Sequence, residues 1–237
     1  MRLLLTLLTI YFYSFLTNAQ QYEIEYNHTI TFDDLVTRAV YKLTATHEAS
    51  YYIKLKSEQE ARNGTELINA NTGAIPFVYK DYLQKQTRYN QPMINKVFFI
   101  KDELPLQTWK LASETKQIKS FKCKKATTTF RGRKYTAWYS TDISLMGGPW
   151  KFDGLPGLIL AVASDDGVLS IEATKIEKKP LKPLPVSTFK ADEAITWDAY
   201  SLQYKKAMSR IKKSMQANAE PDVELTIKPN LVEIIPL

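Results

Sequence analysis

Cysteine, histidine and glycine are all scarce in this chain of 237 residues. The one cysteine, Cys123, excludes a disulfide within the chain and a cysteine-rich zinc site. The only histidines are His28 and His47, which excludes a metal site built from several imidazoles. The sequence also lacks a P-loop, a Rossmann glycine pattern and a G-x-S-x-G nucleophile motif. We therefore expect no metal ion, no cofactor and no catalytic residues of a familiar kind.

The composition excludes two broad classes of protein. Apolar residues make up 44% of the chain and charged residues 24%, so neither a disordered chain nor a collagen-like fibre fits. Lysine and arginine number 32 against 25 acidic residues, which gives a net charge of +7. A positive surface serves solubility or attracts anionic partners such as lipid headgroups. Nucleic acid is not an expected partner, because the sequence has no basic and aromatic recognition module.

The first nineteen residues have the layout of a secretory signal peptide. Arg2 precedes an apolar run over residues 3–16, and Thr17-Asn18-Ala19 ends in a small residue. The run is shorter than the roughly twenty residues of a membrane-spanning helix. We predict cleavage after Ala19 and a secreted or periplasmic protein with no transmembrane helix after cleavage. A retained signal anchor is the alternative. Residues 20–237 are expected to form a single domain.

Most of the remaining chain alternates apolar and polar residues, which predicts β-strands. In the opening strand, for example, Tyr22, Ile24 and Tyr26 share one face. One stretch instead has the spacing of an amphipathic helix, with the apolar stripe Trp197, Tyr200, Tyr204, Met208 and Ile211. We predict a mainly β (α+β) domain: a single curved antiparallel sheet or half-barrel, with this C-terminal helix packed on its concave face and filling much of the hollow.

Two local features of the sheet follow from the same pattern. The apolar residues within 118–130 change parity, which predicts a β-bulge near Lys124-Lys125. Residues 158–163 and 168–176 are predicted to pair as a hairpin through a type I′ turn at Asp166-Gly167.

Half of the eight glycines lie in one segment, between Gly147 and Gly157, together with Pro149 and Pro156. A rigid glycine-rich loop that carries aromatic residues and one carboxylate lets a ligand approach the backbone. Candidate ligand-binding residues are therefore Trp150, Phe152, Asp153, Gly154, Leu155, Pro156 and Gly157. The alternative is a structural corner whose aromatic side chains fill the core.

The same segment contains the hexapeptide Gly154-Leu155-Pro156-Gly157-Leu158-Ile159. Four blocks precede it in order: Cys123-Lys124-Lys125-Ala126, Phe130-Arg131-Gly132-Arg133, Ala137-Trp138-Tyr139 and Gly148-Pro149-Trp150-Lys151-Phe152. These motifs, within residues 109–176, resemble the central block of the GLPGLI family of secreted Bacteroidota proteins. The resemblance implies an exported bacterial protein and carries no established activity. More distantly, the strand pattern resembles curved half-barrels that carry lipoproteins or lipids across the periplasm, a fold analogy alone.

Lysine and arginine are densest between residues 110 and 134. Successive residues of a strand face opposite sides, so these cations need not form one patch. Candidates for a basic surface that contacts the anionic envelope are Lys122, Lys124, Arg131 and Arg133.

Three classes of function stay open. The expected one is an exported cell-envelope protein of unestablished activity that is not an enzyme and binds a ligand or partner, such as an envelope protein, a lipid or another amphiphile. The second is a hydrolase or thiol enzyme that uses Cys123 or Asp153. The third is a small outer-membrane β-barrel, against which the lysines on many strands argue.

Overall fold

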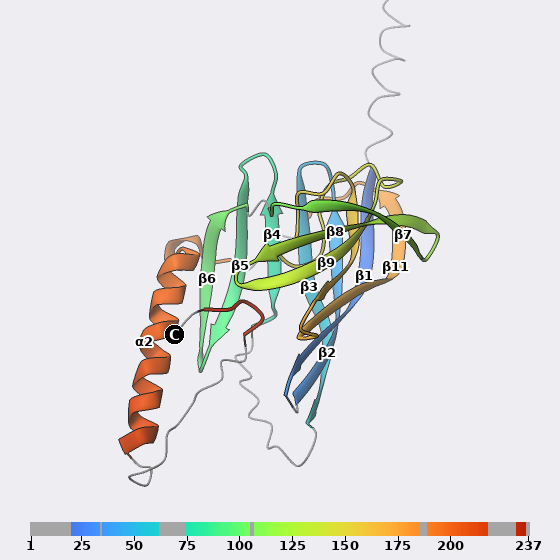
Figure 1. The fold of residues 1–237 in the computed structure, drawn as a ribbon. Helices are drawn as coiled ribbons and strands as arrows, with labels where there is room; N and C mark the ends of the chain where they lie inside the picture. The colour runs from blue at the N-terminus through green and yellow to red at the C-terminus, as the bar shows by residue number, and fades with distance from the viewer. Residues whose placement is uncertain are drawn as a thin grey trace, which may run out of the picture.

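The computed structural model describes residues 20–33, 35–61, 74–104, 107–184, 189–217 and 231–235. The predicted signal peptide, residues 1–19, lies outside them. The described residues form one open antiparallel sheet of 11 strands and a C-terminal helix (Figure 1), which confirms the predicted fold class. Within these ranges, no helix is both long enough and apolar enough to cross a membrane.

The strands form two runs that meet at β1 (Gln20–Phe32), which pairs with β2 on one side and β11 on the other. The first run ends at edge strand β6 and contains β2 (Leu35–Ala45), β3 (Ala49–Ala61), β4 (Phe77–Asp81), β5 (Gln86–Met93) and β6 (Lys96–Glu103). The second run ends at edge strand β7 and contains β11 (Leu169–Pro180), β10 (Leu158–Ser164), β9 (Arg133–Ser140), β8 (Phe121–Phe130) and β7 (Lys110–Ile118).

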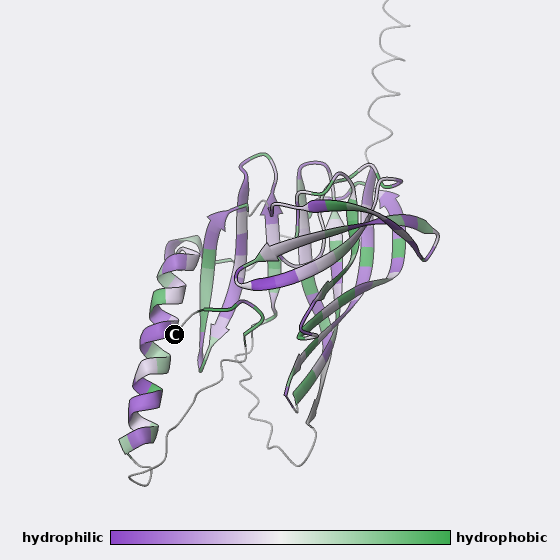
Figure 2. Ribbon diagram, viewed as in Figure 1, coloured by the Kyte–Doolittle hydropathy of each residue, from purple (hydrophilic) through white to green (hydrophobic). Residues whose placement is uncertain are grey.

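The sheet curves strongly, and in Figure 1 strands β7, β8 and β9 run across the front of the upright strands. The core lies on its concave side, where Ile24 and Tyr26 of β1, Leu43 of β2 and Tyr52 of β3 are at most 1% exposed. Side chains alternate between the two faces of a strand, so the period-two pattern of the sequence places these residues together. Figure 2 shows the same alternation of hydropathy along the strands.

A loop fills much of the hollow of the sheet. Ile143, Leu145, Phe152 and Leu155 lie between β9 and β10 and are all buried. The ring of Phe152 packs edge-on against Tyr135 of β9, with the two centroids 4.8 Å apart. This loop occupies the place that the sequence analysis gives to the helix. It connects β9 and β10, so its four apolar side chains lie directly beside the hollow that these strands line.

The helix α2 (Trp197–Ala217) packs at the β6 end of the concave face. It begins after Thr196, whose hydroxyl accepts a hydrogen bond from the backbone N–H of Ala199 at 3.2 Å. The ring of Tyr200 lies 5.5 Å from that of Phe98 in β6, and its hydroxyl donates to the carbonyl of Pro92 at 3.0 Å. The helix therefore closes one side of the hollow.

Of the two predicted local features, the hairpin occurs with a different turn, and the bulge lies on the neighbouring strand. Residues 158–163 and 168–176 do pair, as β10 and β11, but only Gly167 of their turn has positive φ. The turn is therefore not of type I′, which needs positive φ at two residues. The predicted bulge at Lys124-Lys125 of β8 was wrong: the extra residues belong to β7, between Leu111 and Thr115, which pair with Ala126 and Lys124.

Candidate functional site

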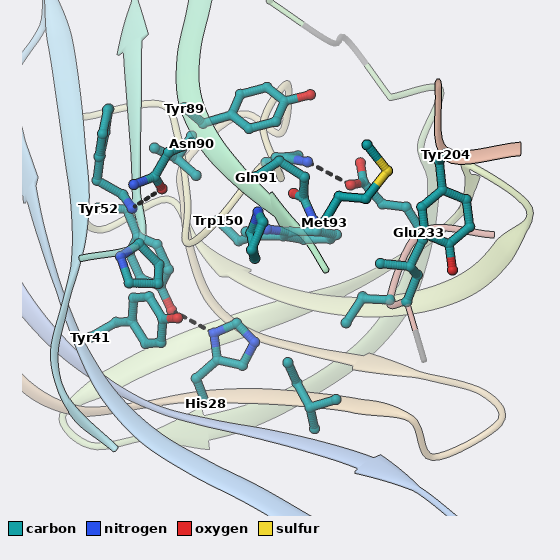
Figure 3. Close-up of a pocket in the computed structure, with 18 of the residues that line it drawn as sticks. His28, Tyr41, Tyr52, Tyr89, Asn90, Gln91, Met93, Trp150, Tyr204 and Glu233 are labelled. Atoms are coloured by element: carbon teal, nitrogen blue, oxygen red, sulfur yellow. Dashed lines mark hydrogen bonds and ion pairs between the residues drawn. The ribbon is translucent and has the colours of Figure 1, made fainter. Parts of the chain in front are cut away.

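A cavity of about 470 Å³ lies on the concave side of the sheet (Figure 3). Strands β1 to β5 form one side, Tyr204 and Met208 of α2 a second, and residues 231–233 a third. The volume is in the range of small-ligand sites. Aromatic and aliphatic side chains form most of the lining, so a ligand must present apolar surface to it.

One end of this pocket is a group of three rings. Tyr41 of β2 and Tyr52 of β3 stack in parallel, with centroids 4.7 Å apart. His28 of β1 lies 4.8 Å from Tyr41, and Figure 3 shows it beside both tyrosines. The three residues are diagonal neighbours on adjacent strands, which places their side chains on the same face of the sheet. Flat rings of this kind pack well against a flat apolar face of a ligand.

His28 supplies the polar atoms of this end. It is 5% exposed, and its Nδ1 lies 3.2 Å from the hydroxyl of Tyr52. Its Nε2 is buried and has no hydrogen-bond partner among the described residues. Burial lowers the pKa of His28 to about 3 and raises the pKa of Tyr52 well above its usual value. Both side chains are therefore uncharged at neutral pH.

Trp150 lies in the middle of the pocket (Figure 3) on a backbone with a φ of 52°, where non-glycine residues are uncommon. Lys80 of β4 holds this loop. Its ammonium group donates to the carbonyls of Gly148 and Phe152 and pairs with Oδ2 of Asp153 at 3.0 Å. Burial lowers the pKa of Lys80, and Asp153 opposes this shift. All three ammonium donors are thus used to tie the strained loop to the sheet.

Lys151 and Glu233 form the opposite wall, where both are buried. Nζ of Lys151 donates to Oε2 of Glu233 at 2.6 Å, and Arg131 pairs with the other oxygen of that carboxylate. Burial lowers the pKa of Lys151 to about 8, against the opposing effect of Glu233. Glu233 is the one carboxylate among the described lining residues. Two cations, Lys151 and Arg131, therefore hold this carboxylate.

The segment 231–235 is fixed in place by the β8–β9 turn. Arg133 donates from Nε to the carbonyl of Val232 at 2.8 Å and from Nη2 to that of Leu231 at 3.2 Å. The backbone N–H of Ile234 donates to the carbonyl of Arg131 at 3.0 Å. These contacts make residues far along the chain a fixed wall of the pocket.

Of the seven candidate residues of the glycine-rich segment, only Trp150 lines the pocket. Phe152 lies in the core, and Asp153 is buried against Lys80. A Cβ atom at Gly157 would lie 2.2 Å from the carbonyl oxygen of Ser140.

The remaining three candidates also lie away from the cavity. Leu155 is buried, whereas Gly154 and Pro156 are exposed. The segment is thus a structural corner that presents one tryptophan to the pocket.

The four basic candidates separate into two pairs. Lys122 and Lys124 are exposed on β8. Arg131 and Arg133 instead pair with Glu233 and Asp166. The two arginines have carboxylate partners, so the four residues do not form one basic surface.

The two nucleophile candidates are also engaged elsewhere. Cys123 is buried, and burial raises the pKa of its thiol to about 11, which keeps it protonated and unreactive. Asp153 accepts hydrogen bonds from Lys80 and Tyr82. The described residues also hold no group of three or more His, Cys, Asp or Glu side chains that could bind a metal ion.

The sequence analysis did not identify the ring group or the Lys151–Glu233 pair. A signal for His28 was present, because the alternation of Tyr22, Ile24 and Tyr26 continues to residue 28 and predicts an inward side chain. No comparable signal marked Glu233, which lies 82 residues beyond Lys151.

Residues 45–206, about two thirds of the chain, match the family model described as "N-glycanase peptide, N-terminal domain". Two solved structures of PNGF-II are similar in fold. One, in space group C2, has a TM-score of 0.53 and 22% identity over 81% of this chain; the other, in P21, has 0.51 and 19% over 80%. The chain spans about a third of the length of each, 33% and 34%. No curated protein matches significantly.

The family match corrects two expectations from the sequence. The short motifs around Gly154–Ile159 do not place the chain in the GLPGLI family, since the match over residues 45–206 is to a different one. It also overturns the expected cell-envelope protein of unestablished activity, because the matched family is named for an N-glycanase. The motifs gave a wrong family prediction because they encode a tight backbone corner. The geometry of a corner does not by itself specify a function.

Proposed function

Because this chain belongs to the family of N-glycanase peptide N-terminal domains, we propose that it takes part in the processing of N-linked glycans and that its pocket holds part of the glycan. The family match over residues 45–206 is the observation that carries the proposal. It includes Tyr52, Trp150 and Tyr204 of the pocket lining.

The chemistry of the pocket supports this proposal. A sugar ring has flat faces of C–H groups, and these pack on aromatic side chains such as Tyr41 and Trp150. Small-molecule sites combine such apolar surface with a few polar groups that fix orientation. His28, Asn90 and Gln91 are lining residues of that kind.

We propose further that these residues bind the glycan and do not cleave it. Cleavage of a glycosidic or amide bond needs a group that can donate or accept a proton at the reacting atom. The pocket carboxylate, Glu233, is held by Lys151 and Arg131, and the imidazole of His28 stays neutral.

The test is a calorimetric titration of the purified chain with a peptide that carries one N-linked glycan, and with the same peptide without it. We expect binding of the glycopeptide alone. Trp150→Ala should weaken that binding by about tenfold, the effect of losing a central aromatic contact. Trp138→Ala is the matched control, because Trp138 lies half-buried on β9 and does not line the pocket.

Equal heats for the two peptides would overturn the proposed glycan binding. Mass spectrometry of the incubated glycopeptide tests the second part. An unchanged mass supports binding without cleavage, whereas release of the glycan would show that the chain is itself a hydrolase.

A further inference from the structure

The turn between β5 and β6 holds an isoleucine in a backbone conformation that isoleucine rarely adopts. Met93 pairs with Lys96 across this turn, and Ile94 follows Met93 with a φ of 54°. Positive φ suits glycine, asparagine and aspartate in two-residue turns, whereas a β-branched side chain crowds the backbone there. Among the described non-glycine residues with positive φ, Ile94 is the only β-branched one. Its side chain is also 50% exposed, so burial within the fold offsets only part of the strain.

Ile94 lies at the mouth of the cavity. It lines the cavity together with Met93 of β5 and Met208 of α2, while half of it remains in contact with solvent. The turn is held in place from the helix, because the hydroxyl of Tyr200 donates to the carbonyl of Pro92 at 3.0 Å. Backbone strain at a fixed position is typical of sites that contact a ligand or a partner. A ligand that fills the cavity and extends out of it would pass beside this side chain.

The chemistry of these three side chains restricts what they contact. Tyr41 and Trp150 of the same cavity offer flat aromatic faces, which suit the faces of sugar rings. Isoleucine and methionine offer no flat face. Flexible methionine side chains are instead common at surfaces that hold apolar side chains of polypeptides. An N-linked glycan is carried by an asparagine of a polypeptide, and the residues on either side of that asparagine can be apolar. The mouth therefore suits the polypeptide part of a glycopeptide.

We infer that Ile94 contacts an apolar side chain next to the glycosylated asparagine, so that this chain selects among glycopeptides by their amino-acid sequence as well as by their glycan. This inference rests on the proposed function and adds the polypeptide to what the pocket binds. Ile94 is then a specificity residue. Its strained conformation is kept because the residues that would relieve it, asparagine and glycine, lack the apolar side chain that makes the contact.

The test compares two glycopeptides that carry the same N-linked glycan. One has leucine on both sides of the glycosylated asparagine, and the other has serine at both places. In calorimetric titrations we expect the wild-type chain to bind the leucine peptide about fivefold more tightly, the effect of burying part of one aliphatic side chain.

Ile94→Asn should bind both glycopeptides as weakly as wild type binds the serine peptide. Its thermal midpoint should nevertheless rise by about 2–4 °C, because asparagine tolerates positive φ. Ile94→Gly should give the same loss of preference and serves as the second variant. A residue with a purely structural role would not combine higher stability with lost selectivity.

Lys119→Asn is the matched control. Lys119 has a φ of 53° in the two-residue turn between β7 and β8, is exposed and does not line the cavity. The substitution relieves a similar conformation, so it should leave the preference for the leucine peptide unchanged.

Equal wild-type affinities for the two glycopeptides, or a preference that persists in Ile94→Asn, would overturn the inference. The proposed function is judged separately. It stands if both glycopeptides bind more tightly than the same peptides without the glycan, and it fails if removal of the glycan changes neither affinity.

Discussion

The two ends of the pocket differ in whether their buried polar groups have hydrogen-bond partners. The corner end is the wall that carries Trp150 and Lys151, with Lys80 behind it. There the charged groups of Lys80 and Lys151 have partners: Lys80 contacts two carbonyls and Asp153, and Lys151 contacts Glu233. At the other end, the neutral ring of His28 keeps one nitrogen without a partner. A neutral unpaired group costs about 1–3 kcal/mol and an unpaired charge far more. The corner end therefore fixes the shape of the pocket, whereas the His28 end keeps an unpaired neutral group.

If the corner end is the scaffold, Lys80→Met should be severely destabilising. The substitution leaves the buried carboxylate of Asp153 without its cation and removes the hydrogen bonds to Gly148 and Phe152. We expect the free energy of unfolding in urea to fall by about 3–5 kcal/mol. Lys122→Met, at an exposed position on β8, should change it by no more than about 0.5 kcal/mol. Similar values for the two variants would contradict the scaffold role.

Gly157→Ala tests the backbone of the same corner. Gly157 has a φ of 151°, and a Cβ atom would clash with the backbone of Ser140. We expect a loss of about 2–3 kcal/mol in the free energy of unfolding. Gly167→Ala is the control, because φ is 74° there but no atom lies within 4 Å of the added Cβ, so only about 1 kcal/mol should be lost. Equal losses in the free energy of unfolding would mean that the backbone of the corner rearranges to accommodate the added Cβ atom.

The His28 end should respond to acid. Burial lowers the pKa of His28 to about 3, whereas an unfolded histidine titrates near 6.5. Between these values the unfolded chain binds the extra proton, so the stability present above pH 6.5 is lost as the pH falls toward 3. Between pH 6.5 and 4.5, wild type should lose about 2 kcal/mol relative to His28→Phe. Parallel pH profiles of the two proteins would show that His28 is not desolvated.

Unpaired polar atoms outside the pocket should matter least. Thr87 of β5 is fully buried, and its hydroxyl has no described partner. Thr87→Val keeps the shape of the side chain and removes that hydroxyl, so the free energy of unfolding should rise by about 0.5–1 kcal/mol. A clear loss of stability in urea unfolding would reveal a hydrogen bond that the static structure does not contain.

The sequence predicted the local elements of the fold well. The period-two pattern located β1 and the paired strands β10 and β11, and the 3.6-residue pattern located α2. Both patterns depend only on neighbours a few residues apart in the sequence. The place of β1 between two runs of strands was not predicted. Its partners β2 and β11 are joined to it by backbone hydrogen bonds, which no side-chain pattern records.

The site was harder to predict, for a physical reason. Because lysine is rarely buried, the sequence indicated that Lys80 and Lys151 lie on the surface. They are buried because the fold brings carbonyl and carboxylate partners to them from distant parts of the chain. Trp150 was identified because glycine and proline marked its loop. The ring group was not, since His28, Tyr41 and Tyr52 belong to three strands and meet only through the register of the sheet.

The wall formed by Leu231, Val232 and Glu233 bears on the order of events during protein synthesis. Strands β1 to β11 all precede it in the chain and can pair while translation continues. The pocket cannot be complete until Glu233 has left the ribosome and met Lys151 and Arg131. A nascent chain halted before that point would carry a nearly finished sheet with an incomplete cavity.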